Sequence, residues 1–333
     1  MAHTKTTIAV LGDGGWGTTL AMHLHHRGHR VRWWGAFPAY VKVVAQRREN
    51  VKFLPGVRIP HSLLITPSLI HAVESAGLIV VAVPSQHLRS VVRRLKSAGL
   101  HRQVLLLSVA KGLERRSLKR MSQVIHEELG PVTVAVLSGP NIASEIARGH
   151  PASSVVASQD QSVAATIQRI FMNGQFRLYT SPDVIGVELG GALKNPIAIA
   201  AGISDGLGFG ANAKSALIAR GVVEMARLGV ALGAREETFW GLSGLGDLIT
   251  TCLGGRNHWL GEQLGRGRRL RTILAETPMV IEGVETARAA VRLGRRHRLE
   301  LPIIEQVDAV LFRGRSPRAA LQALMQRAPK AEC

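Results

Sequence analysis

A glycine-rich segment near the start of the chain has the residue types and spacing of a phosphate-binding turn. Gly12-Asp13-Gly14-Gly15-Trp16-Gly17 matches G-x-G-x-x-G, follows the apolar run Ile8–Leu11 and opens a helical pattern at Thr18. In that context Gly12 permits a tight turn, Gly14 lets a pyrophosphate approach the backbone, and Gly17 lets helix and strand pack closely. The helix N-terminus then offers N–H groups to the phosphates. The segment predicts a dinucleotide site, and a plain tight turn is the alternative.

A lysine inside an apolar, small-residue stretch is the strongest candidate for catalysis. The stretch is Gly190-Gly191-Ala192-Leu193-Lys194-Asn195-Pro196. Burial lowers the pKa of a lysine, which suits Lys194 to proton transfer near neutral pH. Asn195 precedes a proline and is therefore biased out of the α region, so we expect the backbone to deviate there. The alternative is a structural lysine whose stem is buried and whose ammonium reaches water.

Three further segments carry single polar groups that could bind an anion or a reacting group. Lys111 follows the apolar run that ends at Ser108, where it could reach a phosphate or a cofactor oxygen. Asp247 follows Gly244-Leu245-Gly246, where another backbone or a ligand can approach closely. Arg256-Asn257 lies in a glycine-rich loop, and an arginine presents a fork of donors that matches a phosphate.

The end of the second predicted strand bears on the choice of dinucleotide. NAD sites commonly place an acid there for the ribose 2′-hydroxyl. This chain has Trp34-Gly35-Ala36 and no Asp or Glu between Gly17 and Glu49. The interval holds six basic residues: Arg27, Arg30, Arg32, Lys42, Arg47 and Arg48. It therefore favours NADP(H) mildly over NAD(H), and arginines that face solvent are the alternative.

Short apolar runs alternate with helical patterns through the first part of the chain. The predicted strands are Ile8–Leu11, Arg30–Trp34, Leu78–Val83, Val104–Ser108, Val132–Leu137, Ser154–Ala157 and Phe176–Tyr179. The predicted helices are Thr18–Arg27, Gln86–Ser97, Ser117–Leu129, Asn141–Arg148 and Gln161–Phe171. Strands that are apolar throughout are typical of a parallel sheet covered on both faces, so the order predicts a doubly wound α/β domain.

The later part of the chain has long helical patterns, such as Asn212–Leu228 and Val284–His297, and no convincing strand. We therefore expect a Rossmann-type dinucleotide-binding domain over residues 1–185 and an all-helical substrate-binding domain over residues 186–333. A length of 333 residues agrees with about two domains.

Composition and charge exclude several classes of protein. Lys+Arg 42 against Asp+Glu 23 gives a net charge of +19, but aromatic residues are only 4%, which is poor material for stacking on bases. Cys252 and Cys333 cannot form a disulfide framework. We read His23, His25, His26 and His29 as a solvated helix face with no metal. No signal peptide or membrane-spanning run is evident, so we expect a cytoplasmic protein that does not bind nucleic acid and does not insert into a membrane.

Several motifs together resemble the bacterial-type NAD(P)-dependent glycerol-3-phosphate dehydrogenases, over nearly the whole chain. The motifs are Gly12–Gly17, Val83-Pro84-Ser85, Ala110–Glu114, Ser138-Gly139-Pro140, Gly186–Asn195, Ser204–Asn212, Gly244–Leu248, Arg256-Asn257 and Val280–Gly283. The resemblance implies reduction of dihydroxyacetone phosphate to sn-glycerol 3-phosphate with NAD(P)H. That product is the backbone of glycerophospholipids, and a homodimer is possible.

The resemblance also implies roles for particular residues. Lys194 would be the catalytic residue, which protonates the alkoxide as hydride reaches the carbonyl carbon. Substrate would be bound by Lys111, Gly139, Asn141, Lys194, Asp247, Gly255, Arg256 and Asn257. Cofactor would be contacted by Gly12, Gly14, Gly15, Trp16, Gly17, Lys111, Ala143, Arg256, Val280 and Glu282.

The chain departs from the family pattern at four places. Asp13 stands where alanine is usual, and Ala36 replaces a basic residue or histidine after the second strand. The loop before Arg256 is short, with Gly255 in place of a serine, and His258-Trp259 replaces a basic pair.

The sequence thus predicts a two-domain oxidoreductase with its active site in the cleft between the domains. The enzymatic alternative is another ketone or hydroxyacid-type reductase with the same plan and a different substrate. The non-enzymatic alternative is a basic nucleic-acid-binding protein on a Rossmann shell, which would bind nucleic acid in a strongly salt-dependent way.

Overall fold

The structure, a computed structural model, describes residues 6–100, 104–329 and 331. It divides into two compact units, of which the first comprises Met1–Lys111 and Lys119–Glu188. The second comprises Gly112–Leu118 and Leu189–Cys333. The division thus falls inside helix α8 (Val184–Gly206), a few residues after the expected change of pattern, and the segment 112–118 joins the helical unit.

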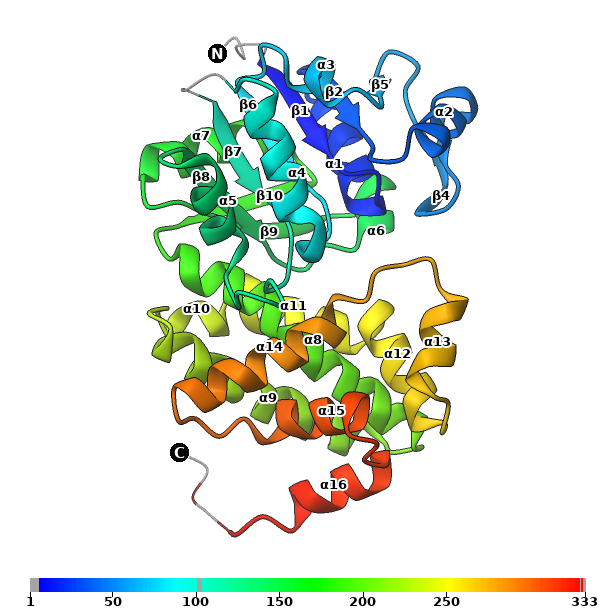
Figure 1. Cartoon of the computed structure of the whole chain (residues 1–333), viewed down its shortest axis with the longest axis vertical. Helices are drawn as coiled ribbons and strands as arrows, with labels where there is room; N and C mark the ends of the chain where they lie inside the picture. Colours follow the sequence, from blue (N-terminus) through cyan, green and yellow to red (C-terminus); the bar gives the residue numbers. More distant parts are fainter. Residues whose placement is uncertain (1–5, 101–103, 330, 332–333) are drawn as a thin grey trace. The chain divides into compact units, whose positions relative to one another are not determined.

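The first unit is built on an eight-stranded sheet with the order β10-β9-β8-β7-β6-β1-β2-β5 (Figure 1). Its strands are β1 Thr7–Leu11, β2 Arg30–Trp34, β5 Leu64–Thr66, β6 Leu78–Val81, β7 Leu105–Ser108, β8 Thr133–Ser138, β9 Ala152–Ala157 and β10 Phe176–Ser181. Neighbouring strands run parallel except for the pair β8 and β9. The predicted Rossmann-type α/β fold is confirmed, and the antiparallel pair is an addition that the alternation of elements did not predict.

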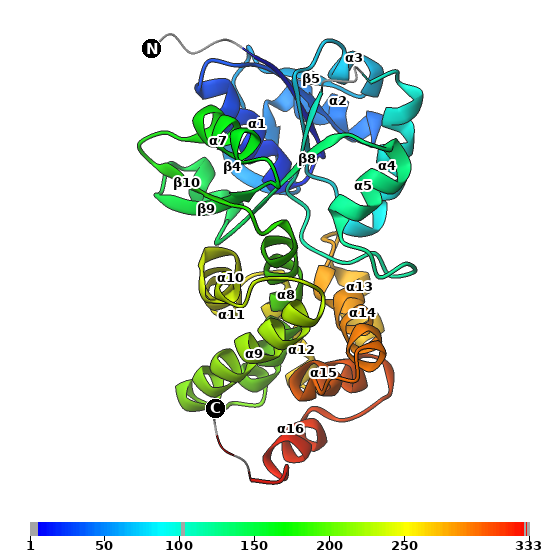
Figure 2. The same ribbon diagram turned by 90° about the vertical axis from the view of Figure 1, so that its left-hand side faces the viewer.

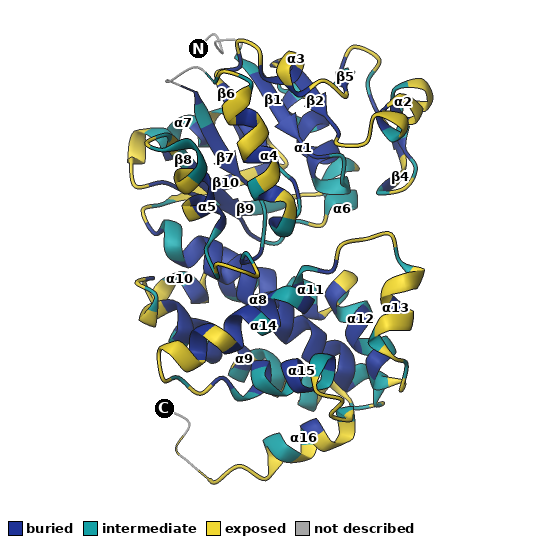
Figure 3. Cartoon of the chain, in the orientation of Figure 1, coloured by how far each residue is buried: buried dark blue, intermediate teal, exposed yellow. Residues whose placement is uncertain are grey.

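Helices cover both faces of this sheet, which explains why its central strands β1, β6 and β7 are largely apolar (Figures 2 and 3). Ile8 and Val10 of β1 belong to one buried cluster with residues of α1 and α7, whereas Ala9 and Leu11 belong to another with residues of α3, α4 and α5. The helices are α1 Gly15–His26, α2 Pro38–Arg47, α3 Leu69–Val73, α4 Ser85–Ser97, α5 Met121–Leu129, α6 Ala143–Ala147 and α7 Gln161–Phe171. The central strands β1, β6 and β7 are therefore buried on two sides, as expected of a parallel sheet.

The sequence patterns missed the region between β2 and β6. It contains α2, the antiparallel pair β3 (Glu49–Asn50) and β4 (Leu54–Arg58), the edge strand β5, and α3. These elements are short, and β4 is buried only at its first and fourth residues, so neither helical nor alternating periodicity stands out.

Among its described residues the second unit has helices and no strand, as predicted. Its elements are the greater part of α8, then α9 Ala211–Ala231, α10 Glu237–Trp240, a π-helical turn η1 Leu242–Gly246, α11 Asp247–Cys252, α12 Arg256–Gly265, α13 Leu270–Glu276, α14 Glu282–Arg296, α15 Pro302–Phe312 and α16 Pro317–Met325. The expected deviation of the backbone at Asn195 is wrong, because Pro196 lies inside the continuous helix α8. A proline there removes one N–H donor, and this buried helix tolerates the loss.

Helices α8 and α12 pack through two pairs of glycines spaced four residues apart. A Cβ at Gly202 would lie 2.0 Å from the His258 carbonyl oxygen, and one at Gly206 would lie 2.3 Å from that of Glu262. Gly261 and Gly265 make the reciprocal approaches, 2.1 and 2.5 Å from carbonyl oxygens of α8. The backbones therefore touch, which holds α12 against the last turns of α8.

We expect Gly202→Ala to lower the free energy of unfolding by about 1–3 kcal/mol, because the added methyl group has no space beside a backbone carbonyl. Urea denaturation followed by circular dichroism measures the change. Gly174→Ala is the matched control, since a Cβ there meets no heavy atom within 4 Å. Equal stability of the two variants would contradict the close helix packing.

A buried carboxylate in the second unit links α9 to α15. Glu224 accepts hydrogen bonds from the main-chain N–H groups of Ile303, at 2.8 Å, and Ile304, at 3.2 Å, in the first turn of α15. Burial raises the pKa of Glu224 to about 7, although the two N–H groups favour its charged form.

This shift predicts a pH dependence of stability. Between the unfolded value of 4.5 and the folded value of about 7, the folded chain holds a proton that the unfolded chain has lost. The contribution of Glu224 is therefore full below pH 4.5 and is lost as the pH rises through about 7, up to about 3 kcal/mol in total. Glu224→Gln keeps an acceptor without the titration. Its free energy of unfolding should fall less than that of the natural chain over this range, and identical pH profiles would refute the assignment.

The histidines at the end of α1 do not form a solvated face. His29 is buried, and the His23 ring stacks on Phe171 and contacts its carbonyl oxygen through Nε2 at 2.6 Å. The interpretation failed because α7 covers this side of α1, a contact that local periodicity cannot show. Within the described ranges no group of three or more His, Cys, Asp or Glu side chains is placed to hold a metal ion.

Helix α8 is long and apolar enough to span a membrane by length and composition alone. However, 89% of its most apolar 18-residue window is buried inside the structure. Its composition is thus that of a core helix. Cys252 is buried in the neighbouring α11, and Cys333 lies outside the described residues.

Candidate active site

The glycine turn joins β1 to α1, as the motif predicts. Gly12 has φ +135°, and a Cβ there would lie 2.4 Å from the Ala82 carbonyl oxygen at the end of β6. A Cβ at Gly17 would lie 2.2 Å from the Gly12 carbonyl oxygen, so both positions require glycine for the fold. Gly14 differs, because a Cβ there meets nothing within 4 Å.

The open position is at the N-terminus of α1, where Gly14 is the N-cap. None of the described side chains caps this end, so the first N–H groups of a twelve-residue helix remain available to an anion. An open space over a glycine beside such donors fits a pyrophosphate. Gly12, Gly14, Gly15, Trp16 and Gly17 are the residues that would hold a dinucleotide there.

Two further predicted cofactor residues lie beside this turn. A Cβ at Gly15 would be 3.7 Å from the Ala143 Cβ at the start of α6, and the Thr19 hydroxyl donates to the Ala143 carbonyl oxygen at 3.1 Å. Trp16 packs edge-on to Phe176, and its buried indole Nε1 has no hydrogen-bond acceptor among the described residues. Ala143 and the turn are thus brought together from distant parts of the sequence.

Lys111, Gly139 and Asn141 meet at the carboxyl ends of the paired strands β7 and β8. The Lys111 ammonium donates to the Gly139 carbonyl oxygen at 2.7 Å and lies 3.4 Å from the Asn141 Oδ1. The Asn141 amide in turn donates to the Ser154 hydroxyl of β9 at 2.5 Å. In doubly wound sheets ligands bind at this edge, so the cluster lies where an anionic ligand would be expected.

In the second unit, Lys194 is buried together with a carboxylate and a hydroxyl. Its Nζ lies 2.5 Å from Asp247 Oδ1 and 2.5 Å from the Thr251 hydroxyl. Lys194 is 6% exposed and Asp247 is 1% exposed, so the alternative of an ammonium in open water is wrong. A buried ion pair without a partner would be costly, and here each charge compensates the other.

The π-helical turn η1 brings Asp247 to Lys194. A Cβ at Gly190, one turn before Lys194 in α8, would lie 2.6 Å from the Ser243 carbonyl oxygen of η1. A Cβ at Gly244 would lie 2.1 Å from the Phe239 carbonyl oxygen. The backbone of η1 thus packs against Gly190 of α8, and the backbone of α10 packs against Gly244 of η1. Single-turn π-helices are frequent at functional sites.

The start of α12 attaches Asn257 to the same stretch of α8. The Asn257 amide donates to Asn195 Oδ1 at 2.9 Å, and Asn257 Oδ1 accepts from the Gly283 N–H at 2.9 Å. The residue after Lys194 is therefore fixed by a hydrogen bond, although the sequence gave Asn195 no binding role.

Arg256, Val280 and Glu282 also lie together. The exposed Arg256 donates to the Val280 carbonyl oxygen at 3.1 Å. The negative charge of the Glu282 carboxylate favours the charged form of the Arg256 guanidinium. Gly255 precedes α12 with φ +95°, a conformation that side chains rarely adopt, which explains why a glycine replaces the usual serine.

Thr251 and Ser154 are candidate functional residues that the sequence did not single out. Thr251 lies four residues after Asp247 on α11, so helical spacing from a suspected carboxylate would have found it. Ser154 offers no such signal, because its contact with Asn141 depends on the pairing of β8 with β9.

A carboxylate does stand at the end of β2, contrary to the sequence interpretation that nothing acidic is available there. A Cβ at Gly35, directly after β2, would lie 3.0 Å from the Asp13 Oδ2. The six basic residues between Gly17 and Glu49 are not placed to bind the 2′-phosphate of NADP(H) at the end of β2. Arg27, Arg32 and Arg48 donate to main-chain carbonyl groups. Arg30, Lys42 and Arg47 face solvent, Arg30 from the opposite end of β2.

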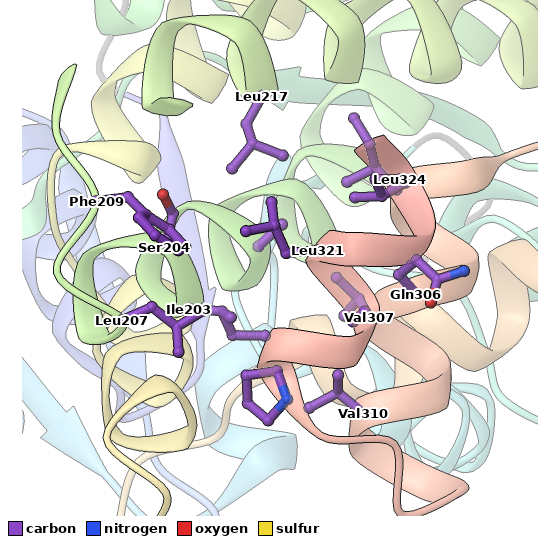
Figure 4. Close-up of a pocket in the computed structure, with 14 residues that line it drawn as sticks. Ile203, Ser204, Leu207, Phe209, Leu217, Gln306, Val307, Val310, Leu321 and Leu324 are labelled. Carbon is purple, nitrogen blue, oxygen red and sulfur yellow. The ribbon is translucent and has the colours of Figure 1, made fainter. Parts of the chain in front are cut away.

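An apolar pocket in the second unit is separate from these polar groups (Figure 4). It lies between α8, α9, α15 and α16, and the side chains that line it include Ile203, Leu217, Val307, Leu321 and Leu324. No charged residue lines it, so it is unsuited to a phosphorylated ligand.

A Rossmann-type sheet with an open glycine turn, together with a helical unit that buries a lysine–aspartate pair, defines a dinucleotide-dependent oxidoreductase of the dehydrogenase class. Two family models match, the N-terminus of NAD-dependent glycerol-3-phosphate dehydrogenase over residues 7–164 and its C-terminus over residues 183–322. The chain belongs to the NAD-dependent glycerol-3-phosphate dehydrogenase family.

Individual relatives match along almost the entire chain. The chain is 48% identical over 325 residues to glycerol-3-phosphate dehydrogenase (NAD(P)+) of Moorella thermoacetica, covering 97% of this chain and 96% of that protein. It is 46% identical over 330 residues to the enzyme of the same name from Geobacillus kaustophilus, covering 98% and 96%. The solved structure of glycerol-3-phosphate dehydrogenase from Coxiella burnetii is similar with a TM-score of 0.94, 36% identity, and coverage of 97% of this chain and 99% of that one.

Proposed function

We propose that the chain reduces dihydroxyacetone phosphate to sn-glycerol 3-phosphate with a reduced nicotinamide dinucleotide, and catalyses the reverse reaction. The observation that carries this proposal is the buried cluster of Lys194, Asp247 and Thr251 in a member of this family. A paired, buried lysine is suited to reversible proton transfer on a ketone oxygen.

Lys194 holds the proton that the reaction needs. Its ammonium donates a hydrogen bond to the ketone oxygen of the substrate and then transfers a proton to it as negative charge develops there. The bound dinucleotide supplies the hydride to the carbonyl carbon. Asp247 and Thr251 orient the Lys194 ammonium, and Asp247 balances its charge in the buried site.

The polar residues around the two candidate clusters bind the rest of the substrate. Arg256 offers a guanidinium fork and Lys111 an ammonium, both of which suit the phosphate group. Asn141, Gly139, Gly255 and Asn257 supply neutral donors and acceptors for the hydroxyl and phosphate oxygens. Ala143, Val280 and Glu282 contact the dinucleotide together with the glycine turn.

The product has the glycerol backbone of membrane phospholipids, so the proposed role is the supply of that backbone in the cytoplasm. A homodimer stays a prediction. The substrate is a small phosphorylated metabolite. The net positive charge of the chain would attract such an anion, so the charge does not require a nucleic-acid partner.

Substrate-dependent oxidation of NADH and NADPH tests the proposal. We expect turnover with dihydroxyacetone phosphate and little with dihydroxyacetone, which lacks the phosphate, or with 2-keto acids. Faster turnover of a keto acid than of dihydroxyacetone phosphate would refute the proposed substrate and would indicate a reductase that acts on another ketone.

A further inference from the structure

Asp13 is the residue of the glycine turn that departs from the family pattern, and its side chain faces the end of β2. The distance from a Cβ built on Gly35 is 3.0 Å both to the Asp13 Cβ and to its Oδ2. Gly35 directly follows Trp34, the last residue of β2. The carboxylate therefore contacts the backbone at the point where β2 leaves the sheet.

This point is where Rossmann domains distinguish the two nicotinamide dinucleotides. In NAD-binding domains a carboxylate there accepts a hydrogen bond from the 2′-hydroxyl of the adenine ribose, whereas an arginine nearby accommodates the 2′-phosphate of NADP. Here β2 itself supplies neither, since it is followed by Gly35 and Ala36. The acid comes instead from the first turn of the fold.

The Asp13 carboxylate accepts hydrogen bonds from main-chain amides, but one of its two oxygens lacks a donor. Its Oδ2 is buried and has no partner among the described residues. Burial raises the pKa of Asp13, while nearby main-chain amides, including those of Ala36 and Phe37, and the charge of Lys52 favour its ionised form. A buried acceptor without a donor is costly, and a ligand hydroxyl that donated to it would relieve that cost.

Two arginines, one in β2 and one directly after α2, are already hydrogen-bonded to main-chain carbonyl groups. Arg32 is buried and donates to the His71 and Glu74 carbonyl oxygens, and Arg48 donates to those of Pro60 and Leu63. The Lys52 ammonium lies over the Phe53 ring, 5.1 Å from its centre. A 2′-phosphate at the end of β2 would therefore lie beside the Asp13 carboxylate, while Arg32 and Arg48 are already bonded to main-chain carbonyl groups.

We infer that Asp13 is a specificity-determining residue that makes the chain prefer NAD(H) over NADP(H). Its carboxylate accepts a hydrogen bond from the ribose 2′-hydroxyl of NAD(H) and repels the 2′-phosphate of NADP(H). The inference rests on the proposed function for the presence of a nicotinamide dinucleotide, and it reverses the mild preference for NADP(H) that the six basic residues suggested.

Direct binding tests this assignment without turnover. Titration calorimetry with NADH and with NADPH gives the two Kd values for the natural chain, for Asp13→Asn and for Asp13→Ala. Glu49→Gln is the matched control. It removes one negative charge from the same unit, and its side chain accepts from the Gly56 N–H on the β3–β4 hairpin.

We expect the natural chain to bind NADH at least about tenfold more tightly than NADPH, because the carboxylate accepts a hydrogen bond from the 2′-hydroxyl and repels the 2′-phosphate. Asp13→Asn should tighten NADPH binding most, because it removes the repulsion and leaves an acceptor. Asp13→Ala should also weaken NADH binding, and Glu49→Gln should leave the ratio of the two Kd values unchanged.

Two results would overturn the inference. One is equal or tighter binding of NADPH by the natural chain. The other is a change of both Kd values by the same factor in the Asp13 variants, which a merely structural role beside Ala36 and Phe37 would produce. Thermal melting confirms that each variant is folded.

The same samples separate this inference from the proposed function. Turnover of dihydroxyacetone phosphate with NADPH preferred over NADH would refute the role of Asp13 and leave the function intact. Discrimination between the cofactors that depends on Asp13, together with no turnover of dihydroxyacetone phosphate, would support the role of Asp13 and refute the proposed function.

Discussion

Replacing Lys194 by methionine is expected to lower kcat by about 10²–10⁴, because the reaction loses its positioned proton donor. Methionine has nearly the length of the lysine stem, so the apolar contacts within α8 are kept. The rate of cofactor oxidation at saturating dihydroxyacetone phosphate measures the effect. Lys96→Met, on the exposed face of α4, removes the same charge and should keep the natural kcat.

The Lys194 variant leaves Asp247 buried without its cation, and breaking a buried pair from one side typically costs about 3–5 kcal/mol. The double variant Lys194→Met with Asp247→Asn removes that uncompensated charge. It should recover much of the lost stability and remain inactive. A well-folded Lys194→Met enzyme with a near-natural kcat would remove Lys194 from the mechanism.

Replacing Gly14 by valine is expected to weaken dinucleotide binding by more than about 2 kcal/mol, or roughly 30-fold in Kd, while the fold is preserved. The structure has open space at the Gly14 Cβ position, and the residue has φ −72° and ψ 169°, which valine adopts readily. The branched side chain would thus occupy only the space proposed for the pyrophosphate. Titration calorimetry with NADH measures the loss.

Gly17→Val is the informative comparison, because the fold requires a glycine at position 17, whereas we propose that ligand binding requires one at position 14. Its Cβ would lie 2.2 Å from the Gly12 carbonyl oxygen, so this variant should unfold or fail to accumulate. Unchanged cofactor affinity of a folded Gly14→Val chain would mean that the motif is only a turn.

The sequence predicted the elements whose signal is local. The seven strands from the apolar runs all exist, because burial on both faces forces a continuous apolar stretch such as Leu78–Val81. The edge strand β5 and the hairpin of β3 and β4 were missed, since few of their residues are buried and their partners are fixed by pairing. Local rules also misjudged Asn195, where burial in α8 overrides the bias imposed by the proline.

The candidate site was predictable in its residue types and not in its contacts. Lys194 was identifiable because a charged residue in an apolar helix is costly to bury, and Asp247 was identifiable because it follows a glycine-rich segment. That the two meet depends on the packing of Gly190 against Ser243, which no periodicity reveals. The contact of Asp13 with the end of β2 was hidden likewise, because Asp13 precedes Gly17 in the sequence and reaches Gly35 only through the folded turn.

Transfer of deuterium from deuterated NADH to the substrate tests the central claim most directly. The natural chain would be incubated with dihydroxyacetone phosphate and NADH that carries deuterium in place of both hydrogens on its reactive carbon, and the product analysed by mass spectrometry. If the chain is the proposed dehydrogenase, the product is sn-glycerol 3-phosphate with one deuterium at its central carbon, formed in equal amount to the cofactor oxidised. No glycerol 3-phosphate, or product whose central carbon carries hydrogen from water, would contradict the account.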